Sequence, residues 1–252
     1  MAISGNSKMH PNKYDFLQNT VHRLEGWLED YAALRSLDLL WWQEQKGVRG
    51  PLVEIGVFRG RYFSLLLESA ARTGDAVLGI DTFQYVGMDQ VRTEIAAGFP
   101  DAPEYAFLPV PSTDLVPSDI LSALGRKKPR FISVDGSHEF EDVVWDLRLC
   151  EEILAPEGIV SVDDFINPVT FGVNQGVHAF FASSRSLVPF AYIANKLFLA
   201  RPMFASVALP ALEQVIMQDE HEPRSVDFRN RLKHGRAHVE QKLWGKPLLS
   251  IP

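Results

Sequence analysis

Short apolar runs alternate with helical segments along the middle of this chain, and this alternation is what most constrains its fold. The runs are PLVEIG, AVLGID, YAFLPV, RFISVD and GIVSVD, and the stretches between them carry apolar residues at three- and four-residue steps. Strands that alternate with helices form a mostly parallel sheet that is covered on both faces. The later segment SLVPFAYIANKLFLAR breaks the alternation, and its AN turn predicts an antiparallel hairpin. We therefore expect an α/β fold with an open, mostly parallel sheet.

Acidic residues stand at the ends of four of these five strands. They are Glu54, Asp81, Asp135 and the adjacent pair Asp163 and Asp164. In an open parallel sheet, ligands bind beyond the carboxyl ends of the strands. One aspartate there can be simple turn chemistry, because aspartate caps helices and favours turns. Four acidic strand ends at one edge favour a ligand site.

The first strand runs into a turn in which Glu54, Gly56 and Gly60 are spaced as E-x-G-x-x-x-G. Glycine allows both a sharp turn and the close approach of a ligand. The spacing differs from the G-x-G-x-x-G of a dinucleotide site, and the acid would repel a phosphate, which argues against a nicotinamide oxidoreductase. Asp81 is placed to accept hydrogen bonds from a ribose diol. The pattern predicts a cofactor with a cationic or neutral centre.

Composition narrows the class of protein. The chain has 252 residues, 46% apolar and 23% charged, which suits one large α/β domain, and its net charge of −7 argues against a nucleic-acid surface. The single Cys150 cannot form an internal disulfide, which favours a reducing cytoplasm. No apolar run has the length of a membrane helix, and the N-terminus lacks the apolar centre of a signal peptide. We expect a cytoplasmic protein that binds neither membrane nor nucleic acid.

Five motifs give the chain a family resemblance. In order, they are VEIGVFRGRYFSLLL, LGIDTF, VPSTDL, ISVDGSHEFEDVVWDL and LAPEGIVSVDDF. They resemble the core of class I S-adenosylmethionine-dependent methyltransferases, and in particular the metal-dependent sugar O-methyltransferases of the macrocin and mycinamicin type. The resemblance implies a Rossmann-like α/β fold with a seven-stranded, mostly parallel sheet, an antiparallel last strand and helices on both faces.

The same resemblance suggests how the chain is divided. Residues 1–47 are expected to be an N-terminal helical segment, with helix from about residue 14 to residue 46. Residues 48–203 would form the S-adenosylmethionine-binding core. Residues 204–252 would form a helical and extended C-terminal extension.

The resemblance also implies how the cofactor is held. Glu54, Gly56 and Gly60 match the loop on the methionine side, and Asp81 matches the residue that holds the ribose. Ser112 matches the position that contacts the adenine. We assign Asp135 to the cofactor site as well.

A metal site is expected between the fourth and fifth strands. Neighbouring parallel strands lie about 4.8 Å apart, so Asp135, Asp163 and Asp164 would meet above the sheet. Three carboxylates in a small space repel one another unless protons or a cation intervene. Hard oxygen ligands suit Mg²⁺ or Mn²⁺, and the resemblance assigns the same three residues as metal ligands.

His138 and Asp135 are the expected catalytic residues. A divalent cation that binds adjacent sugar hydroxyls would lower the pKa of the attacking one, and His138 would then take its proton. An unperturbed histidine pKa of about 6.5 leaves the side chain mostly neutral at pH 7. The resemblance gives His138 this base role, whereas catechol methyltransferases have a lysine at the corresponding place. The alternative is that His138 caps the next helix.

The sequence thus predicts an O-methyltransferase that uses S-adenosylmethionine and Mg²⁺ or Mn²⁺ to methylate a hydroxyl of a sugar or glycoside. One alternative keeps the cofactor but methylates a catechol or phenol. Another is an inactive S-adenosylmethionine-binding partner subunit. The expected partner is a small sugar or glycoside, and the sequence leaves a homo-oligomer open.

Overall fold

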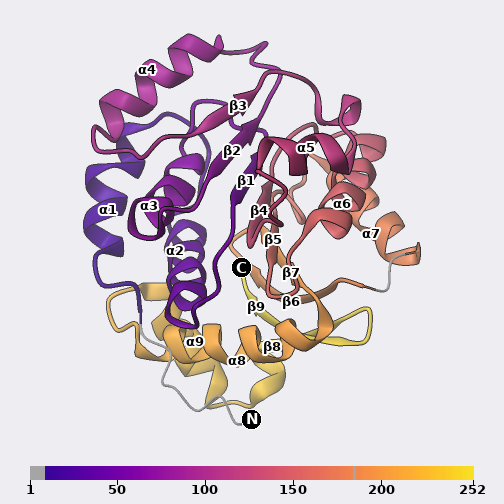
Figure 1. Cartoon of the computed structure of the whole chain (residues 1–252). Helices are drawn as coiled ribbons and strands as arrows, with labels where there is room; N and C mark the ends of the chain where they lie inside the picture. The colour runs from indigo at the N-terminus through magenta and orange to yellow at the C-terminus, as the bar shows by residue number, and fades with distance from the viewer. Residues whose placement is uncertain (1–8, 184–185) are drawn as a thin grey trace.

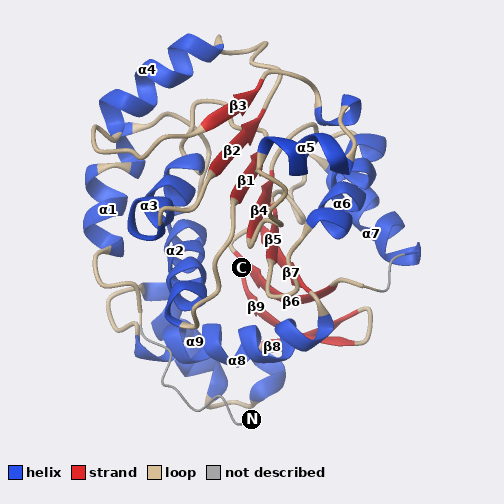
Figure 2. Cartoon of the chain, viewed as in Figure 1, coloured by secondary structure: helices blue, strands red, loops and turns tan. Residues whose placement is uncertain are grey.

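A single open sheet runs through the centre of the computed structural model, which describes residues 9–183 and 186–252 (Figures 1 and 2). The strand order within these residues is β3-β2-β1-β4-β5-β7-β6-β9-β8. The strands are β1 (Leu52–Ile55), β2 (Val77–Ile80), β3 (Ala106–Leu108), β4 (Phe131–Val134), β5 (Ile159–Val162), β6 (Val188–Ile193), β7 (Lys196–Ala200), β8 (Glu240–Leu243) and β9 (Lys246–Ile251). Strands β1 to β5 are parallel, and β7 runs antiparallel to both β5 and β6.

Helices cover both faces of the sheet. In Figure 2, α2 and α3 lie on one side of the sheet, and α5, α6 and α7 lie on the other. The helices are α1 (Lys13–Asn19), α2 (Asp30–Gln45), α3 (Phe63–Thr73), α4 (Met88–Gly98), α5 (Pro117–Ala123), α6 (Phe140–Ile153), α7 (Phe171–Ser183), α8 (Pro202–Gln218) and α9 (Pro223–Leu232), with short 3₁₀ turns η1 (Val21–Arg23), η2 (Ser112–Asp114) and η3 (Arg236–His238).

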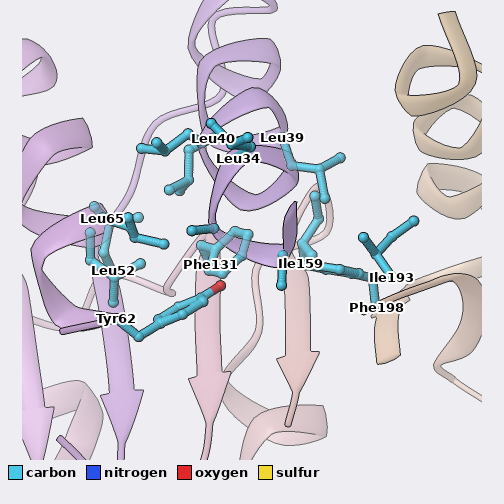
Figure 3. Close-up of a cluster of buried hydrophobic side chains, with 14 of the residues drawn as sticks. Leu34, Leu39, Leu40, Leu52, Tyr62, Leu65, Phe131, Ile159, Ile193 and Phe198 are labelled. Atoms are coloured by element: carbon cyan, nitrogen blue, oxygen red, sulfur yellow. The ribbon is translucent and has the colours of Figure 1, made fainter. Parts of the chain in front are cut away.

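The core has two layers because strand residues alternate between the faces. Leu52 packs under α2 and α3, whereas Val53 and Ile55 pack under α6 and α7. Figure 3 shows the first layer, where leucines of α2 lie over Phe131 and Ile159. Glu54 lies between two apolar neighbours on β1 and points to the same face as Leu52. A carboxylate is therefore built into the core beneath the carboxyl edge.

The antiparallel hairpin expected near the end of the sheet is confirmed as β6 and β7. The α/β fold is also confirmed, but the sheet has nine strands in the described residues, not seven. The difference lies in the C-terminal extension, where β9 pairs with β6 in parallel and β8 pairs with β9. The extension therefore continues the sheet at its edge.

The expected N-terminal helix is interrupted. The chain forms α1 and η1, leaves the helical conformation near Leu24, and enters α2 only at Asp30. Gly26 explains the break, because its φ of +147° lies outside the helical region and favours glycine. The interruption carries Trp27 out to the carboxyl edge of the sheet, where its side chain is 86% exposed.

A buried ionic cluster joins the N-terminal helices to the segment that follows α8. The carboxylate of Asp219, which follows α8, accepts hydrogen bonds from Lys13 Nζ (2.9 Å) and Tyr14 Oη (2.6 Å). Arg35 of α2 also donates to it, and Asp38 pairs with Lys13 at 2.8 Å. Burial alone would raise the pKa of Asp219, but Arg35 and Tyr14 outweigh it and hold the pKa well below its ordinary value.

We expect Asp219→Ala to lower the free energy of unfolding by about 3–5 kcal/mol, because it leaves buried cations without a partner. Urea unfolding at pH 7 would measure the change. Asp227→Ala is the matched control, since Asp227 pairs with Arg231 at the surface, and it should cost at most about 1 kcal/mol. Because the folded-state pKa of Asp219 is lowered, its contribution should persist at neutral pH and disappear only in strong acid. Equal losses for the two variants would contradict this account.

None of the helices in the described ranges combines the length and apolar character needed to cross a membrane.

Candidate active site

A cavity of about 1470 Å³ opens at the carboxyl edge of the parallel strands. Ligand pockets commonly measure about 300–1,000 Å³, so this cavity is large enough for two ligands side by side. Its walls come from the ends of β1, β2, β4 and β5, from the β6–β7 turn and from the segment between η1 and α2. Most of the expected site residues line it: Glu54, Gly56, Asp81, Ser112, Asp135, His138, Asp163 and Asp164.

Gly56 allows β1 and β4 to approach closely at the cavity floor. Its φ is +85°, and a Cβ atom at this position would lie 1.9 Å from the carbonyl oxygen of Asp135. A side chain at Gly56 would therefore clash with backbone. Gly60 is not among the lining residues. It lies in the same turn but packs against the side chain of Ile95.

Asp81 organises the first turn through its carboxylate. Its Oδ2 accepts hydrogen bonds from the backbone N–H groups of Val57 (2.8 Å) and Phe58 (2.9 Å), and its Oδ1 accepts one from Phe83 (2.6 Å). Phe58 and Phe83 both have positive φ. Such strained residues concentrate at functional sites and need surrounding bonds to hold them. A carboxylate has about four acceptor positions, so Asp81 keeps capacity for a ligand.

Glu54 is a buried carboxylate, and one of its oxygens has no hydrogen-bond partner. Its side chain is 1% exposed, and Oε2 makes no hydrogen bond. Burial, followed by the charge of Asp135, raises the pKa of Glu54 well above its ordinary value. A buried polar atom without a partner calls for an explanation, and a cationic group in the cavity would satisfy it.

Ser112 also lines the cavity, at the start of η2. Its carbonyl oxygen accepts a hydrogen bond from the indole N–H of Trp145 at 3.1 Å. This bond ties the loop after β3 to α6, so that the loop forms a fixed side of the cavity.

His138 reaches into the cavity between two carboxylates. Its Nε2 lies 3.6 Å from Oδ1 of Asp135 and 3.4 Å from Oδ2 of Asp164, and the side chain is 43% exposed. Burial, followed by the charge of Asp163, raises the pKa of Asp135 to about 7. The interaction with Asp135 in turn raises the pKa of His138, although burial acts in the opposite direction. Each group thus favours a shared proton: Asp135 stabilises the protonated imidazole of His138.

His138 is not the capping residue of the helix that follows. The N-cap position of α6 is Glu139, which makes no side-chain cap bond, and its backbone N–H donates to Ser137 Oγ at 3.2 Å. The geometry favours a role for the imidazole in the cavity over the capping alternative.

Asp163 and Asp164 follow β5, and most of their oxygens are already engaged. Asp163 Oδ1 accepts a hydrogen bond from the backbone N–H of Asp164 (2.9 Å), and its Oδ2 lies 2.6 Å from Lys196 Nζ. Asp164 Oδ1 accepts hydrogen bonds from the side-chain amides of Asn167 (2.8 Å) and Asn195 (2.6 Å). These bonds hold both carboxylates from within the chain.

The described residues do not form the metal site expected from Asp135, Asp163 and Asp164. Across residues 9–183 and 186–252, no group of three or more His, Cys, Asp or Glu side chains is placed to hold a metal ion. The ammonium group of Lys196 instead neutralises Asp163. This donor set does not fit a divalent cation, because one of its three carboxylates is already paired with a buried lysine.

Sequence reasoning missed Lys196, Asn195 and Trp27, which all line the cavity. Asn195 lies in the β6–β7 turn and Lys196 is the first residue of β7, and the antiparallel hairpin returns both to the edge where β5 ends. A lysine opening the apolar stretch KLFLA was the available signal for the first. For Trp27, the available signal was the preceding Gly26, which interrupts the helix.

The comparisons with known proteins concern the domain and the fold. Residues 53–165 match the model of a protein family described as a methyltransferase domain. A search of curated proteins found no significant match to the sequence.

Several solved structures share the fold at low sequence identity. The TDP-rhamnose 3'-O-methyltransferase CalS11 of calicheamicin biosynthesis has 18% identity and a TM-score of 0.51, over 66% of this chain and 76% of that one. The O-methyltransferase NovP has 16% identity and a TM-score of 0.54, over 78% of this chain and 92% of that one. An S-adenosylhomocysteine-bound methyltransferase from Podospora anserina, PaMTH1, has 10% identity and a TM-score of 0.51, over 78% of this chain and 90% of that one.

The fold, the turn after β1 and the matched domain together define a methyltransferase. Residues 53–165 carry a methyltransferase domain, in agreement with the family and the enzyme class expected from the sequence.

Asp81→Ala is expected to weaken binding of S-adenosylhomocysteine by about 1.5–3 kcal/mol, because hydrogen bonds to a charged group are lost. The exposed Asp101→Ala is the control and should bind like the wild type. Calorimetric titration would measure both variants, with NAD as a ligand that should give no signal. Unchanged affinity in Asp81→Ala, or binding of NAD by the wild type, would contradict the cofactor site.

Proposed function

We propose that this enzyme is an O-methyltransferase that acts on a hydroxyl of a sugar or glycoside. The observation that carries the proposal is the position of His138, a half-exposed imidazole that faces the cavity between Asp135 and Asp164. A hydroxyl is a poor nucleophile until its proton is removed, so O-methylation benefits from a base at this place.

The cofactor is proposed to bind along the ends of β1 and β2. Glu54 would accept a hydrogen bond from the cationic methionine end, the turn at Gly56 would leave room for it, Asp81 would meet the ribose and Ser112 would meet the adenine. The buried, unpartnered Oε2 of Glu54 supports a cationic ligand. When bound, S-adenosylmethionine supplies a methyl group on an electron-poor sulfonium centre.

His138 is proposed to take the proton from the acceptor hydroxyl through Nδ1, because Nε2 faces the carboxylates of Asp135 and Asp164. Asp135 orients the imidazole and stabilises its protonated form, which raises the pKa of His138. Asp164 faces the imidazole from the other side, and the side-chain amides of Asn167 and Asn195 hold its carboxylate in place. Alignment of the hydroxyl oxygen with the methyl group contributes up to about 7–11 kcal/mol in well-ordered systems, so these positioning contacts matter as much as the base.

The cavity rim supports a sugar or glycoside as acceptor. Trp27 stacks on Phe58 with ring centroids 5.5 Å apart and an interplanar angle of 19°, while its outer face stays open. Tyr85 and Val169 are each 83% exposed and line the same cavity. Sugar rings present C–H faces that pack on open aromatic faces, and their hydroxyls then point to polar groups deeper in the site. CalS11, a TDP-rhamnose 3'-O-methyltransferase, shares the fold.

The divalent cation expected from the resemblance is not part of the proposal. Asp163 is paired with Lys196, and the remaining carboxylates do not form a metal-binding group among the described residues. Each proposed step uses side chains of this chain.

An acceptor panel tests the proposal. Purified enzyme and S-adenosylmethionine are incubated with nucleotide-linked sugars, glycosides, free sugars and catechols, and release of S-adenosylhomocysteine is followed. We expect release that depends on a sugar-containing acceptor. Release with catechols alone would replace the sugar acceptor with a phenol, and absence of release with every acceptor would favour a non-catalytic subunit.

A further inference from the structure

We propose that Lys196 provides, from within the chain, the positive charge that a divalent cation provides in metal-dependent methyltransferases of this type. The enzyme would then bind no divalent ion at Asp163 and would work without one. The catalytic part of this inference rests on the proposed function, whereas the metal-binding part stands on the geometry alone.

The position of Lys196 follows from the antiparallel strand. β7 begins at the carboxyl edge, where Leu197 lies opposite Val162 in the ladder, so Lys196 stands beside Asp163. Its side chain is 2% exposed and extends over the ring of Tyr62, with Nζ 4.4 Å from the ring centroid. Buried lysines are rare unless they are paired, so a fully buried ammonium at this edge indicates a specific role.

The charges around Lys196 account for its burial. Nζ lies 2.6 Å from Asp163 Oδ2, and Asp135 is the next charge that stabilises the ammonium form. Glu54 also interacts with Lys196, which partly offsets the effect of burial on the glutamate. One cation thus serves several carboxylates that would otherwise repel one another.

The same contacts leave little for a metal ion to bind. Both oxygens of Asp163 are engaged, one by Lys196 and one by the backbone of Asp164. One oxygen of Asp164 holds two amide donors, and the other faces His138. A divalent ion would have to displace the ammonium group and then lie beside it in a low-dielectric site, where like charges repel strongly.

Lys196 acts as a positioning residue, because it contacts Asp163 and not the acceptor. By neutralising Asp163 it limits the negative charge beside Asp135 and His138. Asp135 then remains available to the imidazole, and the excess of carboxylates over lysine still favours a cationic cofactor in the cavity.

The test is a Mn²⁺ titration followed by electron paramagnetic resonance, which does not depend on knowing the acceptor. The wild type should show no site-specific Mn²⁺ binding. Lys196→Met removes the charge while keeping an unbranched side chain, and it should acquire Mn²⁺ binding that the second substitution Asp163→Asn abolishes. Lys242→Met, at an exposed lysine of β8, should behave like the wild type.

Activity gives a second readout with an acceptor from the panel. Wild-type turnover should be unchanged in EDTA. Lys196→Met should lose about 10²–10³-fold in kcat, the size of effect seen when one electrostatic stabiliser is removed from an active site. Lys196→Arg, which keeps the charge, should recover part of the loss, and Lys196→Met should respond to added Mn²⁺.

Two results would overturn the inference. One is tight Mn²⁺ binding by the wild type that Asp163→Asn removes, and the other is loss of wild-type turnover in EDTA with recovery on adding Mg²⁺. Both are measured on the wild-type fold, so they decide the matter even when Lys196→Met does not fold. Sugar methylation that requires Mg²⁺ would refute the inference and leave the proposed function intact. Failure of every sugar acceptor would refute the proposed function and leave the Mn²⁺ result standing.

Discussion

His138→Ala is expected to lower kcat by about 10²–10⁴-fold, the usual contribution of a general base. The loss should appear in kcat more than in KM, because the proton moves only on the way to the transition state. Binding of S-adenosylhomocysteine should be unchanged, since His138 is not among the proposed cofactor contacts. Single-turnover kinetics with a responding acceptor, together with calorimetry on the same sample, would measure both quantities.

The pH dependence of kcat is an independent test of the base role of His138. A protonated imidazole cannot accept a proton, so kcat should rise as the pH increases through the raised pKa of His138. The acidic limb of the wild-type profile should therefore lie above the ordinary histidine value of about 6.5. In His138→Ala this limb should disappear.

A control separates this role from a structural one. His234→Ala changes an exposed histidine whose ring contacts the backbone of Asn230 and the ring of His238, and it should keep the wild-type rate. Thermal melting of both variants should give midpoints close to that of the wild type. A folded His138→Ala variant with wild-type kcat and an intact acidic limb would remove the base role from this residue.

Gly56→Ala is expected to abolish measurable binding of S-adenosylhomocysteine. The new Cβ would lie 1.9 Å from the carbonyl oxygen of Asp135, so β1 and β4 would have to move apart at the cavity floor. The positive φ adds about 1–3 kcal/mol of backbone strain. Calorimetry and urea unfolding should show loss of the cofactor site together with a lower free energy of unfolding.

Gly74→Ala is the matched control for that substitution. Gly74 also has positive φ, +71°, but a Cβ there meets no atom within 4 Å. It should show the backbone strain alone and bind S-adenosylhomocysteine like the wild type. Equal behaviour of the two variants in both measurements would contradict the close approach of β1 and β4.

The central part of the fold could be predicted because its signals are local. Each apolar run became a parallel strand, and the AN turn became the β6–β7 hairpin with positive φ at Ala194 and Asn195. The last two strands could not be predicted in the same way. β8 is EQKL, a polar edge strand without an apolar pattern, and only its pairing with β9 makes it a strand.

The candidate site could be predicted as far as the parallel strands determine it. Glu54, Asp81 and Asp135 meet because the carboxyl ends of parallel strands share one edge. Lys196 could not be placed, because it enters that edge from an antiparallel strand whose position in the sheet is not evident from the sequence. The bonds that Asp81 makes to Val57 and Phe58 were equally hidden, since they depend on how the turn after β1 folds back.

The most direct test of the proposed reaction follows a trideuterated methyl group from S-adenosylmethionine to the acceptor. The product of a glycoside that responds in the acceptor panel is isolated, and fragmentation mass spectrometry and NMR locate the label. The account predicts the label on a sugar oxygen with the wild type, and only a trace of labelled product with His138→Ala in the same time. Label on an aglycone phenol, or unlabelled acceptors from an enzyme that still binds S-adenosylhomocysteine, would contradict it.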